Sequence, residues 1–446
     1  MGTCLVFLTP PFQVLDEFFH FYRAYHVSEG KWFAQKLEHR VGDFLPASIH
    51  RSAQDLFADM PFHPEKKMSL SRLHAALAIP LAPDDRTFVD FNTTALIPPL
   101  AYVPQAAGIV VGRIFGFPPI LMMYLGRLTN FLTWLILVFF SVRLTPVGKW
   151  VFVFLALAPM CIFQVASLSY DALAIGLAFM VTALALRMAF NPHEVVSWKE
   201  LIGFCVSLAA LGFVKFIYAT LGAMFLIIPL RRFTSRKQYA VTLAVLFGLL
   251  LVAGVAWVTL ARRLFITYAE YDERVRNLAA LIPGVNPSEQ LRFMVAHPRH
   301  FLGRLWDSLK YFEVMRSFVA WPGWTKEGFP WWFIRSYLAA LTAVALLNGD
   351  KIATLSWKQR AVMFFAGMAT VVFIGAFLFM QWSPVRCIFV LGLHGRYFIP
   401  IGPCVVLALF HNRFLTVRDR VLGVFVLVLL VPSEAFLVAR LIRLFY

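Results

Sequence analysis

Charged residues are scarce in this sequence: of its 446 residues, only 15% are Asp, Glu, Lys or Arg, whereas 60% are hydrophobic. A soluble globular domain is about 25% charged. The composition therefore excludes an ordinary soluble domain and predicts an integral membrane protein. Basic residues dominate the charged set, with 41 Lys and Arg against 24 Asp and Glu. Because they form short runs between apolar segments, as cytoplasmic loops do, they do not indicate a nucleic-acid partner.

Cysteine is also rare. The five cysteines all lie in or beside apolar segments, and none belongs to a C-x-x-C pair. This pattern excludes a structural zinc site and loops held by disulfides. The histidines of the first polar segment match no ligand spacing, and the sequence has neither a P-loop nor a dinucleotide-binding fingerprint. We therefore predict no metal site and no cofactor, and leave a requirement for a divalent cation open.

The apolar runs predict an all-α integral membrane protein with about ten to twelve transmembrane helices. Single spans are expected at 118–142, 148–166, 170–189, 239–260, 331–348, 360–382, 397–410 and 420–443. The run 200–230 is too long for one helix and is interrupted by Lys215, so two shorter helices are expected to meet near 213–215. The whole chain, 1–446, is predicted to form one polytopic membrane domain, with two sizeable extracytoplasmic loops at 14–95 and 262–330.

Two apolar segments are not expected to cross the membrane. Segment 96–115 has three prolines near its start, which favours a re-entrant or interfacial helix. Residues 2–12 are too few to cross about 30 Å of hydrocarbon, so either the true start lies upstream or the first helix is a stub. The densest basic run, 231–237, marks the cytoplasmic side. Counted from it, the unusual polar residues of the apolar segments all face away from the cytoplasm.

A cluster of titratable residues follows the first apolar stretch. Asp16 and Glu17 are adjacent, and in a helix Asp16, His20 and Arg23 would share one face. A partly desolvated carboxylate has a raised pKa, which suits a general base, and His20 would orient it or share the proton. The alternative is an interfacial helix cap in which Arg23 reaches lipid phosphate.

Further polar residues interrupt the apolar segments, where a charge is costly. Lys215 and Arg396 are predicted to bind an anionic headgroup, although Lys215 would also suit the membrane interface. Asp171 is either a site residue or a helix N-cap. Arg127 and Asn130 lie three apart within one apolar span. A structural pair inside the bundle and a contact with substrate explain them equally well.

Six motifs of the sequence are shared with a known family. They are PFQVLDEFFHFYRAYHVSEG (11–30), PPLAYVPQA (98–106), YLGRLTN (124–130), SYDA (169–172), HP (297–298) and GRYFIP (395–400). The sequence thereby resembles a bacterial family of predicted multispanning membrane proteins of unknown function, related to the GT-C glycosyltransferases. It departs from the family at Leu15, where proline is more frequent.

The resemblance implies a GT-C-like helical bundle in the bacterial inner membrane. It implies transfer of a sugar from a polyprenyl-phosphate-linked donor to a cell-surface glycan or lipid-linked acceptor on the periplasmic side, among membrane lipids. The catalytic acidic residue of GT-C enzymes lies in the first extracytoplasmic loop, just after the first span, and Asp16 and Glu17 match that place. The alternatives are a flippase of lipid-linked saccharides and an envelope assembly protein without catalytic activity. The predicted catalytic residues are Asp16, Glu17 and His20, and the predicted substrate-binding residues are Arg23, Tyr102, Gln105, Arg127, Asn130, Asp171, Lys215, His394, Arg396 and Tyr397.

Overall fold

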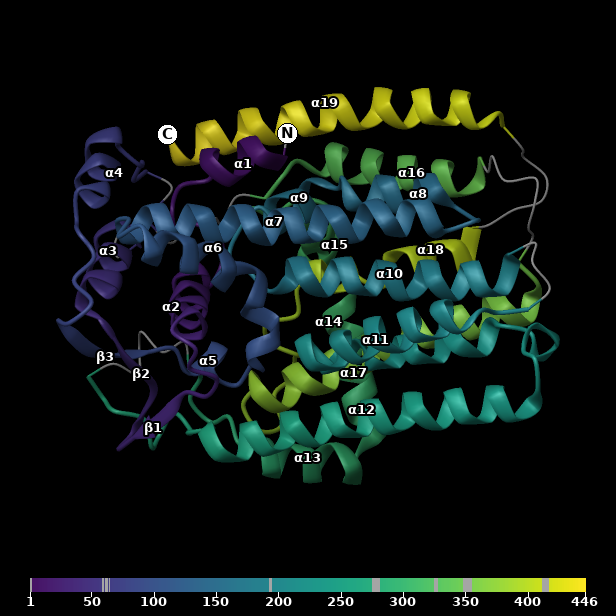
Figure 1. Ribbon diagram of the computed structural model, residues 1–446, viewed down its shortest axis with the longest axis horizontal. Helices are drawn as coiled ribbons and strands as arrows, with labels where there is room; N and C mark the ends of the chain where they lie inside the picture. Colours follow the sequence, from purple (N-terminus) through teal and green to yellow (C-terminus); the bar gives the residue numbers. More distant parts are fainter. Residues whose placement is uncertain are drawn as a thin grey trace.

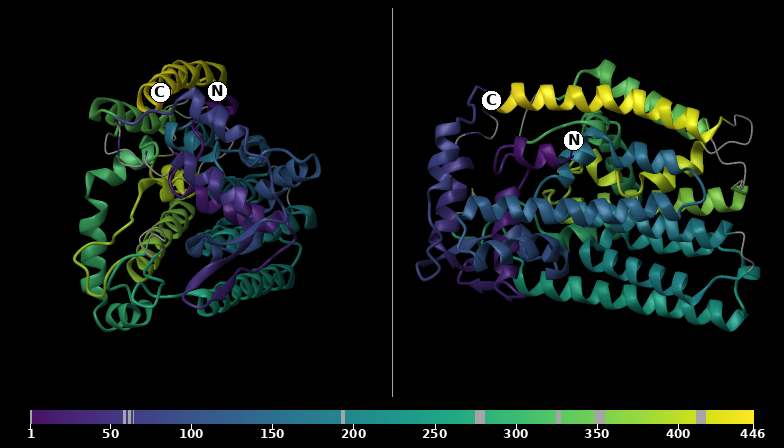
Figure 2. Two further views of the ribbon diagram at one scale, coloured as in Figure 1. Left: turned by 90° about the vertical axis from the view of Figure 1, so that its left-hand side faces the viewer. Right: turned by 45° about the horizontal axis from the view of Figure 1, so that its top comes forward.

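The computed structural model describes residues 2–57, 60, 63, 65–191, 195–274, 281–324, 328–347, 355–410 and 417–446, and long helices dominate it. Within these ranges, five helices are long and apolar enough to cross a membrane. They are α7 (Pro119–Leu144), α10 (Asp171–Phe190), α12 (Arg236–Leu264), α17 (Trp357–Gln381) and α19 (Asp419–Phe445). These helices run along the longest axis of the molecule (Figures 1 and 2). The prediction of a helical membrane protein is confirmed.

The described ranges contain fewer long apolar helices than the ten to twelve predicted spans. The predicted single span at 148–166 is wrong, because α8 (Lys149–Ala156) ends shortly before Pro159, where α9 (Pro159–Val165) begins. Proline has no N–H to donate and cannot continue the helix. The predicted span 397–410 is likewise divided into a 3₁₀-helix, η4 (Gly395–Phe398), and α18 (Gly402–Phe410). Helix α16 (Trp331–Leu346) has 16 residues, about 24 Å, which is shorter than a typical span.

The predicted break near Lys215 is confirmed. Helix α11 (Trp198–Val214) ends there, and the 3₁₀-helix η2 (Phe216–Ile227) begins directly after it. Lys215 itself is extended, with φ −156° and ψ 91°. Its N–H still donates to the carbonyl of Leu211, but the chain then turns away, and η2 packs along α17. Because of this break, the Lys215 side chain lies in the interior of the bundle.

The polar segment 14–95 is folded, contrary to its interpretation as a loop. Its elements are α2 (Glu17–Ser28), β1 (Gln35–Leu37), β2 (Arg40–Pro46), α3 (Ala47–Phe57), α4 (Leu70–Leu77), β3 (Arg86–Asp90) and α5 (Asn92–Ala95). The strands form an antiparallel sheet in the order β1-β2-β3. The sequence did not indicate this sheet, because β1 is three residues long and β2 pairs with a strand on the far side of two helices. The segment lies at one end of the bundle (Figure 1).

Segment 96–115 contains the short elements η1 (Pro99–Tyr102) and α6 (Val103–Ile114). Helix α6 has 12 residues, about 18 Å, too short to cross the hydrocarbon core. It packs against α7 and α2. The N-terminal α1 (Gly2–Leu8) is also short and lies against α7. A re-entrant position for α6 stays a prediction.

Basic residues gather at the opposite end of the bundle, where α7, α10 and α16 end and α8, α11, α12, α17 and α19 begin (Figure 1). The short 3₁₀-helix η3 (Leu230–Arg232) belongs to this end. The described basic residues at these helix ends are Arg143, Lys149, Arg187, Lys199, Arg231, Arg232, Arg236, Lys237, Lys358, Arg360, Arg418 and Arg420. The basic run at 231–237 and the basic residues of the other loops that the sequence assigns to the same side therefore lie together at one end of the bundle.

The second polar segment also folds into helices. Their side chains bind the backbone of the stretch directly before Arg396. These helices are α13 (Pro287–Ala296), α14 (Pro298–Leu309) and α15 (Phe312–Val319). Each provides one side-chain oxygen to a backbone N–H of the stretch 386–395. Gln290 accepts from Arg386 at 2.8 Å, Ser308 from Val390 at 2.9 Å and Ser317 from Gly395 at 2.7 Å.

Gly395 makes the closest approach in this arrangement, so Gly395→Ala is expected to destabilise the protein. A Cβ at this position would lie 1.9 Å from the carbonyl oxygen of Val314 and 2.4 Å from the N of Phe318. Both atoms are backbone and cannot move aside, so we expect a cost of about 1–3 kcal/mol, typical of overpacking. Thermal unfolding in detergent measures it. Gly303→Ala in α14, where a Cβ meets nothing within 4 Å, is the control; an equal loss in both variants contradicts the explanation.

Candidate functional site

A turn at 166–170 forms one wall of the candidate site, and three buried side chains from different elements hold it. Glu17 of α2 accepts a hydrogen bond from the N–H of Leu168 at 3.1 Å. Gln105 of α6 donates to the carbonyl of Leu168 at 3.1 Å. Asn130 of α7 donates to the carbonyls of Ser167 and Ser169 at 2.8 and 2.9 Å. The turn is thereby fixed directly before Asp171, the first residue of α10.

Glu17 also forms a fully buried ion pair with Arg127. Two bonds join them, Nε to Oε1 at 2.8 Å and Nη2 to Oε2 at 2.5 Å, and both side chains are 0% exposed. Arg127 donates in addition to the carbonyls of Val6, Thr9 and Pro10. All of these partners are internal. Of the two explanations for Arg127, the geometry matches the structural pair, and it leaves Glu17 no access to a substrate.

Asp16, in contrast, faces an open cavity. It precedes α2 in a left-handed conformation, with φ 62°, and makes no side-chain capping hydrogen bond. The helix-cap interpretation therefore has no support at Asp16. Burial raises the pKa of the Asp16 carboxyl above its ordinary value of 3.8, an effect that Arg396 partly offsets and Asp171 reinforces. A left-handed non-glycine residue of this kind is frequently found at functional sites.

His20 lies one helical turn from Asp16 and also lines the cavity. Its Nδ1 lies 2.8 Å from the hydroxyl of Tyr102, and its ring meets that of Tyr170 edge to face at 5.6 Å. Burial lowers the pKa of His20 to about 3. The imidazole is therefore neutral at pH 7, and Tyr102 fixes its orientation.

Lys215 and Asp171 form a second buried ion pair, with Nζ 2.6 Å from Oδ1. The other oxygen, Oδ2, accepts from the amide of Gln164 at 3.2 Å. The ammonium also lies over the rings of Tyr170 and Tyr397, at 5.0 and 4.7 Å from their centroids. Lys215 is 7% exposed and so does not reach the membrane interface. Asp171 binds across the bundle instead of capping its own helix.

Arg396 completes the polar wall. Its Nη1 donates to Oε1 of Gln164 at 3.4 Å, and its guanidinium carbon lies 5.3 Å from the ring centroid of Tyr397. Its Nε is buried without a hydrogen-bond partner among the described residues. Gln164 thus bridges Asp171 and Arg396. The Arg396 residue as a whole is 9% exposed.

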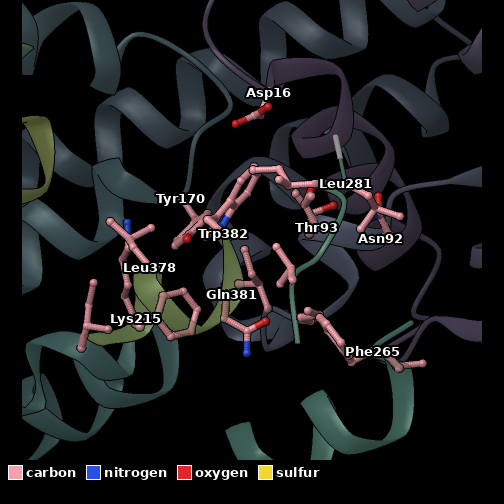
Figure 3. A pocket seen from close by; sticks show the side chains of 18 of the residues that line it. Asp16, Asn92, Thr93, Tyr170, Lys215, Phe265, Leu281, Leu378, Gln381 and Trp382 are labelled. Carbon is pink, nitrogen blue, oxygen red and sulfur yellow. The ribbon is translucent and has the colours of Figure 1, made fainter. Parts of the chain in front are cut away.

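Asp16, His20, Tyr170, Asp171, Lys215, Arg396 and Tyr397 line one cavity between α2, α10, α12 and α17 (Figure 3). The remaining wall is largely apolar and comes from the second half of the chain. It includes Trp257, Phe265, Ile374, Phe377, Leu378 and Trp382. The cavity thus combines two carboxyl groups, two cations and an extended apolar surface.

Six of the predicted site residues line this cavity, and seven do not. The lining residues are Asp16, His20, Asp171, Lys215, Arg396 and Tyr397; the others are Glu17, Arg23, Tyr102, Gln105, Arg127, Asn130 and His394. Arg23 donates to Nδ1 of His26 at 2.7 Å and to backbone carbonyls, so it does not share the Asp16 surface. His394 packs on Tyr397, and burial lowers its pKa to about 3.

Sequence reasoning missed Gln164 and Tyr170 as members of the site. Gln164 is a polar residue in an apolar run, the same signal that drew attention to Asn130, and this signal would have found it. Tyr170 adjoins Asp171 but carries no charge. No group of three or more His, Cys, Asp or Glu residues within the described ranges is arranged to hold a metal ion.

Comparison with known proteins places the chain in a family. A family model described as a predicted membrane protein, DUF2142, matches residues 1–405. The chain belongs to the DUF2142 family. No curated protein and no solved structure matches it. The match covers every element that lines the cavity, from Asp16 to Arg396, so the candidate site lies within the DUF2142 region.

Proposed function

We propose that this DUF2142 protein is a membrane glycosyltransferase of GT-C type. It transfers a sugar from a polyprenyl-phosphate-linked donor to a glycan or lipid-linked acceptor. The observation that carries the proposal is the cavity itself, in which a carboxyl with a raised pKa, Asp16, lies opposite two cations, Lys215 and Arg396, beside an apolar wall. The cations suit a phosphate and the apolar wall suits a prenyl chain.

The proposed reaction needs one base and one anion-binding group. The acceptor hydroxyl attacks the anomeric carbon, and the bond from that carbon to the phosphate oxygen breaks. Asp16 takes the hydroxyl proton, and the leaving polyprenyl phosphate keeps the electron pair. Lys215 and Arg396 stabilise the charge that develops on the phosphate. Tyr102 fixes the neutral His20 beside Asp16, and Glu17, Gln105, Arg127 and Asn130 act as positioning residues.

The basic residues gathered at one set of helix ends support the proposed sidedness. The basic helix ends are expected in the cytoplasm by the positive-inside rule. Asp16 and His20, which line the cavity, belong to the start of α2, and α2 lies toward the other end (Figure 1). On this basis the active site would face the periplasm of a bacterial inner membrane, and the short helix pairs α8–α9 and α11–η2 would complete a GT-C-like bundle.

Sugar transfer by the reconstituted protein tests the proposal. Purified protein in liposomes receives a panel of polyprenyl-phosphate-linked sugars, and mass spectrometry detects released polyprenyl phosphate together with a new glycosidic bond. Movement of donor across the bilayer without a new bond would instead favour a flippase, which the helix break at Lys215 also suits. Absence of both reactions with every donor would leave the assembly-protein alternative.

Arg396→Met is expected to raise the KM for the donor by about 10- to 100-fold, because a hydrogen bond to a charged group contributes about 1.5–3 kcal/mol. Arg396→Lys keeps the charge but not the planar fork, so its KM lies between those of Arg396→Met and the wild type. Initial rates at varied donor concentration measure the effect. Arg299→Met, at an exposed position of α14, is the control. Equal KM values for all variants would remove Arg396 from donor binding.

A further inference from the structure

Helix α14 runs across the direction of the spanning helices, at the outside of the bundle (Figures 1 and 2). It packs on α17, where Leu305 lies against Gly375. The ring of Phe301 lies 5.7 Å from that of Phe379. Gly375 and Phe379 precede the end of α17, at Gln381, by six and two residues. At about 1.5 Å per residue, α14 therefore crosses α17 within about 9 Å of its end.

Three stripes of side chains run along α14. The members of each stripe follow one another at steps of four and three residues, so they share one face of the helix. The middle stripe is buried and consists of Phe301, Leu305 and Ser308. One flank is apolar and consists of Leu302, Trp306 and Leu309. The opposite flank is polar and consists of His300, Arg304 and Asp307.

Two residues of the apolar flank are exposed, Leu302 by 48% and Trp306 by 62%. The stretch before Arg396 lies beside this helix, because Ser308 accepts from the N–H of Val390. The neighbouring segments expose further apolar side chains, which are Leu291, Val295, Ile388 and Phe389. Apolar surface that gathers in this way beside polar residues indicates contact with a membrane or with a partner protein.

The depth of α14 along α17 favours lipid as the occupant. Helix α17 has 25 residues, about 37 Å, which exceeds the hydrocarbon core of about 30 Å. A crossing within about 9 Å of its end therefore lies close to the boundary between acyl chains and headgroups. Amphipathic helices that lie in the plane of the membrane bury their apolar face about 5–10 Å deep at this boundary. Exposed Phe373 and Phe377 continue the apolar surface along α17.

The charge of α14 is complementary to lipid phosphate. Residues 298–310 contain three basic residues and one acidic residue. The ammonium of Lys310 lies 5.2 Å from the ring centroid of Trp306. Tryptophan and lysine are typical anchors at a membrane interface, where the ring lies at headgroup level and the ammonium extends to a phosphate. On the polar flank, Nε of Arg304 donates to Nε2 of His300 at 3.2 Å.

We propose that α14 is an interfacial helix that binds phospholipids of the leaflet opposite to the basic helix ends. Leu302 and Trp306 insert among the acyl chains, Lys310 binds an anionic headgroup, and the polar flank faces water. The inference does not depend on the proposed function, because lipid binding requires no sugar transfer.

Photo-crosslinking from four positions of α14 tests this orientation. In the full-length protein, p-benzoylphenylalanine replaces Leu302, Trp306, His300 or Asp307 one at a time. The protein is irradiated in nanodiscs of phosphatidylglycerol and phosphatidylcholine, and mass spectrometry detects lipid adducts. We expect adducts at 302 and 306 and their loss at 300 and 307. The last two positions are matched controls, because all four side chains are exposed.

The lipid composition of the adducts tests the role of Lys310. With the crosslinker at 306, the share of phosphatidylglycerol among the adducts is compared with its share in the nanodisc. We expect an enrichment, which Lys310→Met lowers by up to about fivefold, the effect of one lysine near an anionic surface. Lys358→Met, at the basic end of the bundle, is the control and should leave the enrichment unchanged.

Three results would overturn the interfacial position of α14. They are the absence of lipid adducts at 302 and 306, equal adduct yields at 300 and 307, and crosslinks at 306 that join two copies of the chain instead of lipid. An unchanged share of phosphatidylglycerol in Lys310→Met would overturn the assignment of Lys310 to the headgroup.

Discussion

Replacing Asp16 by asparagine is expected to lower the rate of sugar transfer by about 10²- to 10⁴-fold, the usual contribution of a general base. Asparagine has nearly the same shape but cannot accept the acceptor proton. Because Lys215 and Arg396 remain, donor binding is expected to stay within about twofold of the wild type. Single-turnover transfer and donor binding, measured on the same preparation, separate the two effects. Transfer at the wild-type rate would show that Asp16 is not the base.

The stability of the Asp16→Asn variant provides the control. A carboxyl whose pKa is raised on folding contributes most to stability below its unfolded-state pKa, and the contribution is lost as the pH rises through the folded-state pKa. At pH 7 the ionised Asp16 therefore costs stability, and asparagine removes that cost. The variant should unfold at the same temperature as the wild type or higher. A lower unfolding temperature would make its inactivity uninformative.

The same raised pKa predicts the pH dependence of the wild type. A general base acts in its ionised form, so kcat/KM falls as the pH decreases through the pKa of Asp16. Because burial raises this pKa, the acidic limb is expected above 3.8, the ordinary value of an aspartate. Rates measured from pH 4 upward at constant ionic strength locate the limb. A profile that stays flat down to pH 4 would exclude a base with a raised pKa.

Replacing Arg127 by methionine is expected to destabilise the fold by at least about 3–5 kcal/mol, the cost of breaking a buried ion pair from one side. The substitution leaves Glu17 buried at 0% exposure without its cation. It also removes the donor from one carbonyl of α1, at Val6, and from two in the segment between α1 and α2, at Thr9 and Pro10. We expect the protein to lose its monodisperse peak in size-exclusion chromatography, or to unfold at a much lower temperature.

Glu17→Gln separates the charge from the hydrogen bonds. Glutamine still accepts a hydrogen bond through one oxygen, and Arg127 keeps its three carbonyl partners. This variant should therefore lose less stability than Arg127→Met. Lys149→Met, at the basic end of the bundle, removes a cation outside this network and serves as the control. If Arg127→Met and Lys149→Met unfold at the same temperature, the ion pair does not organise the N-terminal region.

The sequence predicts much of this architecture, because apolar length and charge are strong signals in membrane proteins. It locates α7, α10, α12, α17 and α19 within a few residues and places the helix break at Lys215. It fails where the signal is weak or distant. The sheet depends on pairing between β2 and β3 across two helices, and the proline that divides α8 from α9 lies inside a run that remains apolar throughout.

The sequence predicts which residues belong to the candidate site. It does not predict which of them bind another residue and which face the cavity. An intramembrane charge signals that a residue matters, without saying whether its partner is another residue or a substrate. Glu17 and Asp16 are adjacent in sequence, yet one is locked to Arg127 and the other faces the cavity. Which of the two neighbouring carboxylates faces the cavity depends on the left-handed backbone conformation at Asp16, and the sequence does not reveal that conformation.

The three side chains that hold the 166–170 turn have a consequence for biosynthesis. Glu17, Gln105 and Asn130 all precede the turn in the sequence. They have therefore already been synthesised when the turn leaves the ribosome. Lys215 follows soon after and neutralises Asp171. Arg396 comes roughly 180 residues later, about 9–36 s at a synthesis rate of 5–20 residues per second. During that interval the Asp171–Lys215 pair can form while the Asp16 carboxyl still lacks the Arg396 cation, and α13–α15 are synthesised before that last cation.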